Sequence, residues 1–484
     1  MRGGGADAER TRAARVKPAE ARGWIALAGG TLAFFLAMRA EAACQGRPTD
    51  AGGYLGYSYT GATVKSFAGA RTRVVYATSG PNSVDLATTR GDGVPDSVAL
   101  AADIGDKSFV KYAEMGFKQP PSDEACASHG EDDKLDVYLV AFTGADGTTA
   151  QESCAGNTCS SFVLVESTFS GRGYPSPAEG FRTVVAHELF HAVQNGYDAG
   201  MDRFWAEGTA QWAMKQVYPE LVDFERQLPA FFKDNTRSLD TQPSGVTAGF
   251  LYGASVWPLF LTLRHGPDTV KDIFEREMDG TKAIDATELV LMTKQATIAT
   301  DYPIFGAYNA ATKTLANDGG GYPDSAKYPG VKQETLADGA TAITSGLSYF
   351  VYRGTLDTLS KISIEGDPAR VGGVVVPISE GKVKLASSIT ALPANITGEV
   401  LVVIAGTTTK KSDAPFTIRI GPPETGAGQP PGGVSPGDTP GDGADDGGCS
   451  VTPSPATPST WLTTLAVALF LALGRARSSR TRAS

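Results

Sequence analysis

The chain has 484 residues, which is too long for one ordinary hydrophobic core, so we expect two or three folded units. Its 41% hydrophobic and 9% aromatic content suits globular packing and excludes a largely disordered chain. The formal net charge of −10 argues against nucleic acid as a partner, because the phosphate backbone attracts basic proteins. Both chain ends are basic, so the acidic excess lies between them, as in an exported protein with processing signals.

The N-terminus has the layout of a secretory signal. A basic leader ends at Arg22, an apolar stretch runs from Trp24 to Met38, and small residues precede Cys44. This order of basic, apolar and small residues predicts a signal peptide over residues 1–43. A lipid anchor on Cys44 and an uncleaved membrane anchor are the alternatives.

The segments that follow alternate between strand-like and helix-like patterns. Runs of β-branched and aromatic residues predict strands at Arg73–Thr78, Leu135–Phe142 and Ser161–Ser167. Apolar residues at helical spacing predict a helix over Ser97–Met115. Short alternating runs return after residue 340, and we expect strands at Ser348–Tyr352, Lys361–Glu365, Val371–Val376, Glu399–Ala405 and Pro415–Ile420.

These patterns predict an α+β fold with distinct regions in chain order. We expect an N-terminal α/β part at 44–175, a helical part at 176–320 and a small antiparallel β-sandwich at 335–421. Residues 422–460 are rich in Pro and Gly and predict a disordered linker or stalk. Residues 461–484 form an apolar segment with a basic tail, and the apolar run within it, Trp461–Gly474, is too short to span a bilayer well.

The five cysteines fit disulfides better than a metal site. None of them has the spacing of a zinc knuckle, and exported proteins favour disulfide bonds. Cys154 and Cys159 are close enough to close a small hairpin. Cys126 has either of these two, or Cys44, as a partner, and the sequence leaves that choice open.

Two of the four histidines stand together in His187-Glu188-Leu189-Phe190-His191. The context predicts a helix, because Ser176-Pro177-Ala178-Glu179 is an N-terminal capping box and Gly196 is a stop signal. Residues four apart on a helix share one face, so both imidazoles can reach one zinc ion at about 2.0–2.1 Å. Glu188 lies one step round the helix and is our candidate general base for a zinc-bound water.

A catalytic zinc also needs a third protein ligand and an open position. The candidate is Glu207, about one turn into a helix that we expect to start near Asp202. Packed antiparallel to the histidine helix, it can face both imidazoles. Asp198 is the alternative ligand, and Gln211 is a candidate hydrogen-bond partner for a ligand imidazole.

Two motifs together, H-E-x-x-H and the later W-x-E-G-x-A, resemble the gluzincin metallopeptidases, and within them a group of exported bacterial zinc metalloproteases. The resemblance covers residues 70–310 and implies a zincin-like catalytic domain, built of a mixed sheet and active-site helices. It implies the zinc ligands His187, His191 and Glu207, with Glu188 as the base. It also implies an oxyanion stabiliser from a later helix, for which the candidates are Tyr252, His265 and Tyr197.

The C-terminal tail carries a second resemblance. Gly448-Cys449, the apolar run Trp461–Gly474 and four following arginines are similar to the sorting tail of myxobacterial surface proteins. That likeness implies recognition near Cys449 by export and sorting machinery, and display on the cell surface or outer envelope.

A shorter stretch, Asp92-Gly93-Val94-Pro95-Asp96, resembles a calcium-loop fragment. Oxygen ligands at close spacing suit Ca²⁺, so Asp92 and Asp96 are candidate calcium ligands. An ordinary turn is the alternative, since only two carboxylates are present. His129 and the acids near it are expected to be exposed and unliganded.

These observations predict a zinc-dependent metallopeptidase that is exported and displayed on the cell surface. Its substrate would be a protein or peptide, with Ser161–Ser167 as a candidate sheet edge for strand addition. Contact with a membrane is expected only through the terminal segments. Two other functions are open: a non-catalytic surface or adhesion protein with a relic zinc site, and a zinc hydrolase of a non-peptide substrate.

Overall fold

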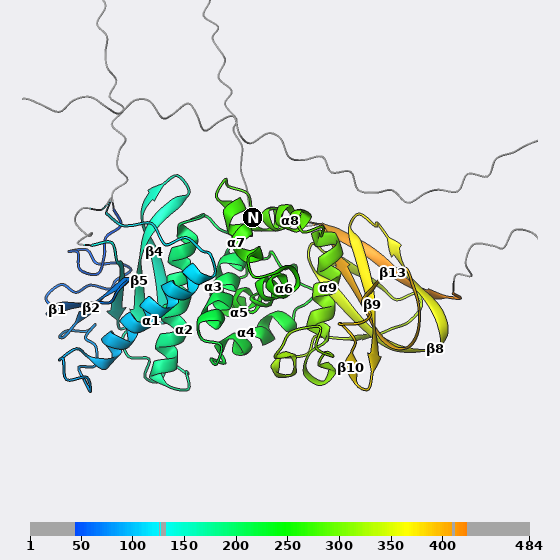
Figure 1. Ribbon diagram of the computed structural model, residues 1–484, viewed down its shortest axis with the longest axis horizontal. Coiled ribbons are helices and arrows are strands. Elements are labelled where there is room, and N and C mark those ends of the chain that lie inside the picture. Colours follow the sequence, from blue (N-terminus) through cyan, green and yellow to red (C-terminus); the bar gives the residue numbers. More distant parts are fainter. Residues whose placement is uncertain (1–43, 125, 127–131, 409–411, 424–484) are drawn as a thin grey trace, which may run out of the picture. The chain divides into compact units, whose positions relative to one another are not determined.

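The computed structural model describes residues 44–124, 126, 132–408 and 412–423 (Figure 1). These residues contain two β-sheets and several helices, which confirms the predicted α+β class. The predicted signal peptide, His129, Cys449 and the tail beyond residue 423 lie outside the described residues.

The first sheet has five strands in the order β1-β2-β3-β5-β4. The three central strands run parallel and the two outer pairs are antiparallel. Three of the strands correspond to predicted ones, whereas β1 and β4 were not predicted. Their bounds are β1 Val64–Ala68, β2 Thr72–Ala77, β3 Leu135–Val140, β4 Gly147–Ala155 and β5 Thr158–Glu166.

The prediction that Ser161–Ser167 forms a sheet edge is wrong. Those residues belong mostly to β5, which pairs with β3 on one side and with β4 on the other. The chain turns at Gly156, where φ is +67°, and a Cys154–Cys159 disulfide closes the hairpin. Strand β4 therefore pairs antiparallel with the side of β5 that faces away from β3, and β4 is the edge strand of the sheet.

Each face of this sheet has its own covering layer. Alternate residues such as Val137 and Leu139 pack with helices α1 (Asp96–Glu114) and α2 (Pro177–Asn195). The intervening residues pack beneath the N-terminal segment 44–62, which contributes Tyr59 and neighbouring tyrosines. This two-sided burial follows the side-chain alternation of strands and leaves the parallel centre of the sheet away from water.

The helix that carries the two histidines begins and ends as predicted. The Ser176 hydroxyl accepts a hydrogen bond from the backbone N–H of Glu179 at 3.3 Å, and Pro177 is the first helical residue. Gly196 is the C-terminal cap. The next helix, α3, begins at Arg203 after Asp202, also as predicted. The helices from α3 on are α3 Arg203–Val217, α4 Asp223–Phe232, α5 Gly249–Gly253, α6 Val256–His265, α7 Thr269–Glu277, α8 Ala283–Thr293 and α9 Ile298–Ala310.

The second sheet has eight strands, and its main path runs β10-β9-β12-β8-β13-β7. One face packs against α9, where Gly306 leaves room for Val403 and Tyr349. The other face encloses a separate apolar cluster that includes Phe416. Two predicted strands fall largely within the single long strand β8, and the bounds are β6 Glu334–Thr335, β7 Thr341–Ser345, β8 Tyr349–Gly366, β9 Val371–Ser379, β10 Lys382–Val383, β11 Thr390–Ala391, β12 Ala394–Gly406 and β13 Asp413–Gly421.

One described helical segment, Gly245–His265, is long and apolar enough to cross a membrane. Its apolar window is 56% buried inside the protein. Trp257 and Phe260 within it stack on one another and contact Phe305 of α9. These contacts show that the segment packs within the protein's hydrophobic core.

Two disulfides join four of the cysteines: Cys44–Cys126 and Cys154–Cys159. Both pairings were among those that the sequence left open. The first ties the N-terminal segment to the loop that precedes β3. Since the Cys44 sulfur is in a disulfide, a thioether-linked lipid on the same sulfur is excluded in this state.

The two bridges should differ in their contribution to stability. Replacing Cys44 and Cys126 by Ser should lower the free energy of unfolding by up to about 4.5 kcal/mol, because loop-closure entropy grows with the sequence separation of 82. Replacing Cys154 and Cys159 should cost up to about 2 kcal/mol for a separation of 5. Urea unfolding of the two double variants tests this, and a larger loss for the short loop would contradict it.

Candidate metal centre

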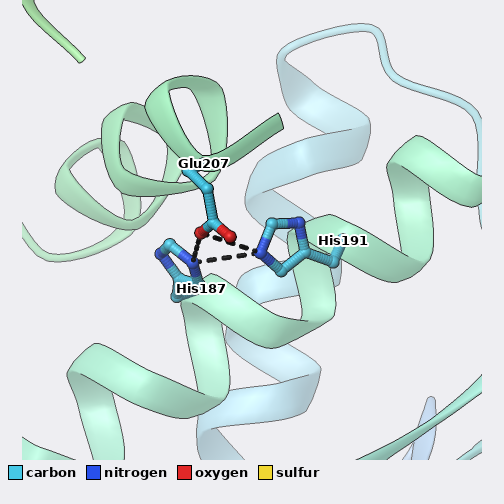
Figure 2. Close-up of side chains that lie close together, drawn as sticks. All are labelled: His187, His191 and Glu207. Atoms are coloured by element: carbon cyan, nitrogen blue, oxygen red, sulfur yellow. Dashed lines mark hydrogen bonds and ion pairs between the residues drawn. The ribbon is translucent and has the colours of Figure 1, made fainter. Parts of the chain in front are cut away.

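Two imidazoles converge on one side of α2. His187 and His191 are four residues apart, and their ring centroids are 4.7 Å apart. Their Nε2 atoms lie 3.1 Å from each other. Figure 2 shows both rings turned toward the same point, as residues on one helix face allow.

A carboxylate from α3 completes the group. Glu207 Oε2 lies 3.2 Å from His187 Nε2 and 3.5 Å from His191 Nε2 (Figure 2). The structure therefore brings together the three predicted ligands. Asp198, the alternative ligand, instead accepts a hydrogen bond from the backbone N–H of Gly200.

The spacing of these three atoms fits a tetrahedral zinc ion. Ligands at about 2.0–2.1 Å from zinc are about 3.3–3.4 Å from one another in a tetrahedron. The observed separations of 3.1, 3.2 and 3.5 Å bracket that value. Two nitrogens and one carboxylate oxygen are also ligands that zinc accepts. Within the described part of the chain, no other set of three His, Cys, Asp or Glu residues has such convergent atoms.

Burial and mutual contacts shift the pKa values of His191 and Glu207 in this group. Burial alone would lower the pKa of His191, but the carboxylates of Glu207 and Glu188 raise it to about 9. Burial would raise the pKa of Glu207, but hydrogen bonds to both imidazoles hold it well below its ordinary value. The carboxylate is thus kept charged and attracts a cation, whether a proton on His191 or a metal ion.

Gln194 orients one of the ligand imidazoles. Its side-chain oxygen lies 2.6 Å from His191 Nδ1, so a proton on Nδ1 leaves Nε2 free to bind a metal. The side-chain nitrogen of Gln194 donates to Ala206 O and to Thr209 Oγ1, which fixes the amide against α3. Gln211, the predicted partner of an imidazole, instead donates to Asp223 at 2.8 Å.

Glu188 is held beside the ligands by β4. The hydroxyl of Thr149 lies 2.8 Å from Glu188 Oε2 and 2.7 Å from the backbone oxygen of Glu188. A Cβ on Gly147 would come within 2.8 Å of Glu188 Cγ and 2.6 Å of a Val184 methyl carbon. Position 147 therefore has to be glycine for β4 to pass so close to α2.

Tyr252 of α5 is the candidate oxyanion stabiliser that lies at the site. Its ring stacks on His187 with the centroids 5.7 Å apart and the planes at 29°. Burial, followed by the negative charges of Glu207 and Glu188, raises the pKa of its hydroxyl well above the usual value. The hydroxyl therefore keeps its proton and can act as a hydrogen-bond donor.

The other two candidates for that role lie elsewhere. His265 pairs with Asp301, which also receives Arg264 at 2.9 Å. Tyr197 is fully buried among aromatic rings, and its hydroxyl accepts a hydrogen bond from the backbone N–H of Lys118. Neither residue lines the cavities beside the candidate metal ligands.

Two cavities flank the site, and Glu188, Gly147 and Tyr252 line both of them. The His191 cavity, of about 370 Å³, is also lined by Thr148, Thr149, Gln151, His191, Gln194, Asn195, Asp198, Ala199, Met201, Arg203, Ala206 and Glu207. The His187 cavity, of about 300 Å³, is also lined by Gly144, Ala145, Asp146, Tyr174, Thr183, Val184, His187, Gln211, Asp223 and Gln227. The candidate base and oxyanion donor thus stand between two openings.

The predicted calcium ligands have local partners within their own turn. Asp96 accepts hydrogen bonds from the backbone N–H and hydroxyl of Thr89. Asp92 accepts from the backbone N–H of Val94 and pairs with Arg90. Both carboxylates therefore make the local hydrogen bonds of an ordinary turn, and calcium binding stays a prediction.

Sequence reasoning missed three residues of the site: Gln194, Thr149 and Gly147. Gln194 follows His191 by three residues on the same helix, a spacing that could have indicated contact. Thr149 and Gly147 carry no local signal, because only the pairing of β4 with β5 brings them to α2.

In the comparisons with known proteins, no family model matches the chain and no curated protein matches it.

Removing the amide of Gln194 should weaken metal binding. Gln194→Leu keeps a similar volume but leaves His191 without its orienting acceptor, so we expect zinc affinity to fall by about 10–100-fold. Competition with a chromogenic chelator at pH 7.5 measures it, with Gln216→Leu on α3 as a control remote from the ligands. Unchanged zinc affinity in Gln194→Leu would contradict the orienting role.

Proposed function

We propose that the protein is a zinc-dependent metallopeptidase of gluzincin type. The observation that carries the proposal is the convergence of His187, His191 and Glu207 at tetrahedral spacing, with Glu188 beside them at the junction of two cavities. A zinc ion bound there would polarise the scissile carbonyl and lower the pKa of a water molecule toward neutrality.

The protein's own groups have separable tasks in this proposal. Glu188 takes a proton from the attacking water and passes it to the leaving amine, with Thr149 holding its carboxylate in position. Tyr252 donates a hydrogen bond to the oxygen that gains negative charge as the carbonyl is attacked. Gln194 holds His191 in the tautomer that leaves Nε2 available.

The edge of the first sheet favours a peptide as substrate. Among described residues, β4 has a strand partner on one side only, and four of its residues line the His191 cavity: Gly147, Thr148, Thr149 and Gln151. An extended peptide can add to such an edge by main-chain hydrogen bonds. Its scissile bond would then lie near Glu188, since Thr149 contacts that carboxylate.

We further propose that the first sheet with α1, α2 and α3 is a zincin-like catalytic domain. Helix α2 carries both histidines beneath a mixed sheet, and α3 supplies the third ligand. The two disulfides favour an oxidising compartment and thus export. Surface display through the sorting tail is proposed from the sequence alone.

Peptide hydrolysis should depend on the carboxylate of Glu188. Glu188→Gln cannot accept the proton, so we expect casein cleavage to fall by about 10²–10⁴-fold or below detection, while zinc content is unchanged. Activity and bound zinc are measured on the same purified samples. Retained cleavage in a zinc-loaded Glu188→Gln would favour another mechanism, and no cleavage by the wild type would favour the relic-site alternative.

Loss of the Tyr252 hydroxyl should affect turnover more than binding. Tyr252→Phe keeps the stacking on His187 but removes the donor, so we expect kcat to fall by about 10²-fold with little change in KM. Tyr197→Phe serves as the control, because Tyr197 lies in the core outside both cavities. Equal effects of the two substitutions on kcat would remove Tyr252 from the mechanism.

A further inference from the structure

The His187 cavity has a lining that the proposed chemistry does not require. Three carboxylates line it, those of Asp146, Asp223 and Glu188, and no Lys or Arg does. The His191 cavity, on the other side of Glu188, is also lined by three carboxylates, those of Glu188, Asp198 and Glu207, but it includes the cation of Arg203 as well. The two sides of the site therefore differ in charge, and the His187 cavity is the more acidic one.

Hydrogen bonds fix the acceptors of this cavity in place. The side-chain nitrogen of Gln211 donates to Asp223, so the amide oxygen of Gln211 remains as an acceptor in a side chain that is only 2% exposed. The Tyr174 hydroxyl donates to Asp146 at 3.0 Å. These contacts orient the carboxylates without using all of their lone pairs, since each ionised oxygen can accept more than one hydrogen bond.

The nearest cations reach these carboxylates from outside the lining. Arg226 lies 2.9 Å from Asp223, and Arg172 lies 3.4 Å from Asp146. Arg226 also donates to Gly173 O and lies over the Tyr174 ring, so its guanidinium is bound to residues beside the cavity. Both arginines are partners of the acids, and neither is among the residues that line the cavity.

We propose that the His187 cavity is a specificity pocket for a lysine or arginine side chain next to the scissile bond of a peptide substrate. The proposal rests on the proposed peptidase function. A lysine ammonium carries three donors and an arginine guanidinium five, which match a pocket whose fixed groups are mostly acceptors. An apolar side chain there would leave buried acceptors without hydrogen bonds, so it would be disfavoured.

The first test uses the folded, zinc-loaded protein and a peptide library varied on both sides of one bond. Products are identified by mass spectrometry, which also shows on which side the pocket acts. We expect Lys or Arg at one of the two flanking positions to give a kcat/KM at least about tenfold above norleucine, a chain of similar length without charge. Preference for apolar or acidic residues at both positions would overturn the pocket.

A charge substitution in the lining provides the second test. Gln227→Lys places a cation in the pocket, so kcat/KM for the Lys peptide should fall at least about tenfold while that for the norleucine peptide is maintained or rises. Gln333→Lys makes the same change in net charge at a residue directly before the second sheet that lines neither cavity. It should leave the ratio of kcat/KM between the Lys and norleucine peptides unaltered. Asp146→Asn removes a carboxylate at a partly exposed position and should also lower the preference for the Lys peptide over the norleucine peptide.

The outcomes separate the pocket from the peptidase itself. If the zinc-loaded wild type cleaves no library member, both the peptidase function and the pocket are overturned. If it cleaves peptides but shows no basic preference, or if Gln227→Lys leaves the Lys-to-norleucine ratio unchanged, only the pocket is overturned. Melting temperatures of the variants confirm that each one is folded.

Discussion

The site depends on the packing of α2 against α3, which holds one carboxylate within 3.5 Å of two imidazoles. Such a cluster is costly to bury unless its charges are paired, because carboxylates lose hydration in the interior. The two helices meet that requirement with the amide of Gln194, which joins His191 to the backbone and hydroxyl of α3. The same contacts that stabilise the helix pair therefore set the geometry of the three candidate ligands.

A second constraint comes from the close passage of β4 over α2. Gly147 permits the approach, and Thr149 then contacts both the backbone and the carboxylate of Glu188. The strand thus fixes the candidate base and also forms the edge beside it. Positioning of the base and access for an extended chain are consequences of one arrangement, so a change that displaces β4 should disturb both.

The sequence was sufficient for features determined by local signals. The caps of α2, the start of α3 and the convergence of the candidate ligands His187 and His191 follow from residue type and helical spacing. The position of Glu207 near both imidazoles followed from the expected turn between the two helices, and the resemblance independently implied the same residue as a candidate ligand. What could not be predicted depends on long-range pairing: the edge position of β4 has no local signature, since its sequence lacks a clear apolar alternation.

The second sheet is connected to the site through the chain between α4 and α5. The backbone N–H of Leu239 donates to Leu347 O, just before β8, and the backbone N–H of Tyr349, the first residue of β8, donates to Asn235 O. The side chain of Asn235 also donates to Tyr349 O. The hydroxyl of Ser238 accepts from the backbone N–H of Leu347.

Those contacts hold the segment that leads from α4 into α5, the helices that carry Asp223 and Tyr252. Asp223 lies in the lining of the His187 cavity, and Tyr252 stacks on a candidate metal ligand. A sheet used only for display on a surface would need no hydrogen bonds to this segment. The second sheet therefore stabilises the segment between α4 and α5, whereas β4 of the first sheet contacts Glu188 of α2, so each sheet supports a different part of the candidate centre.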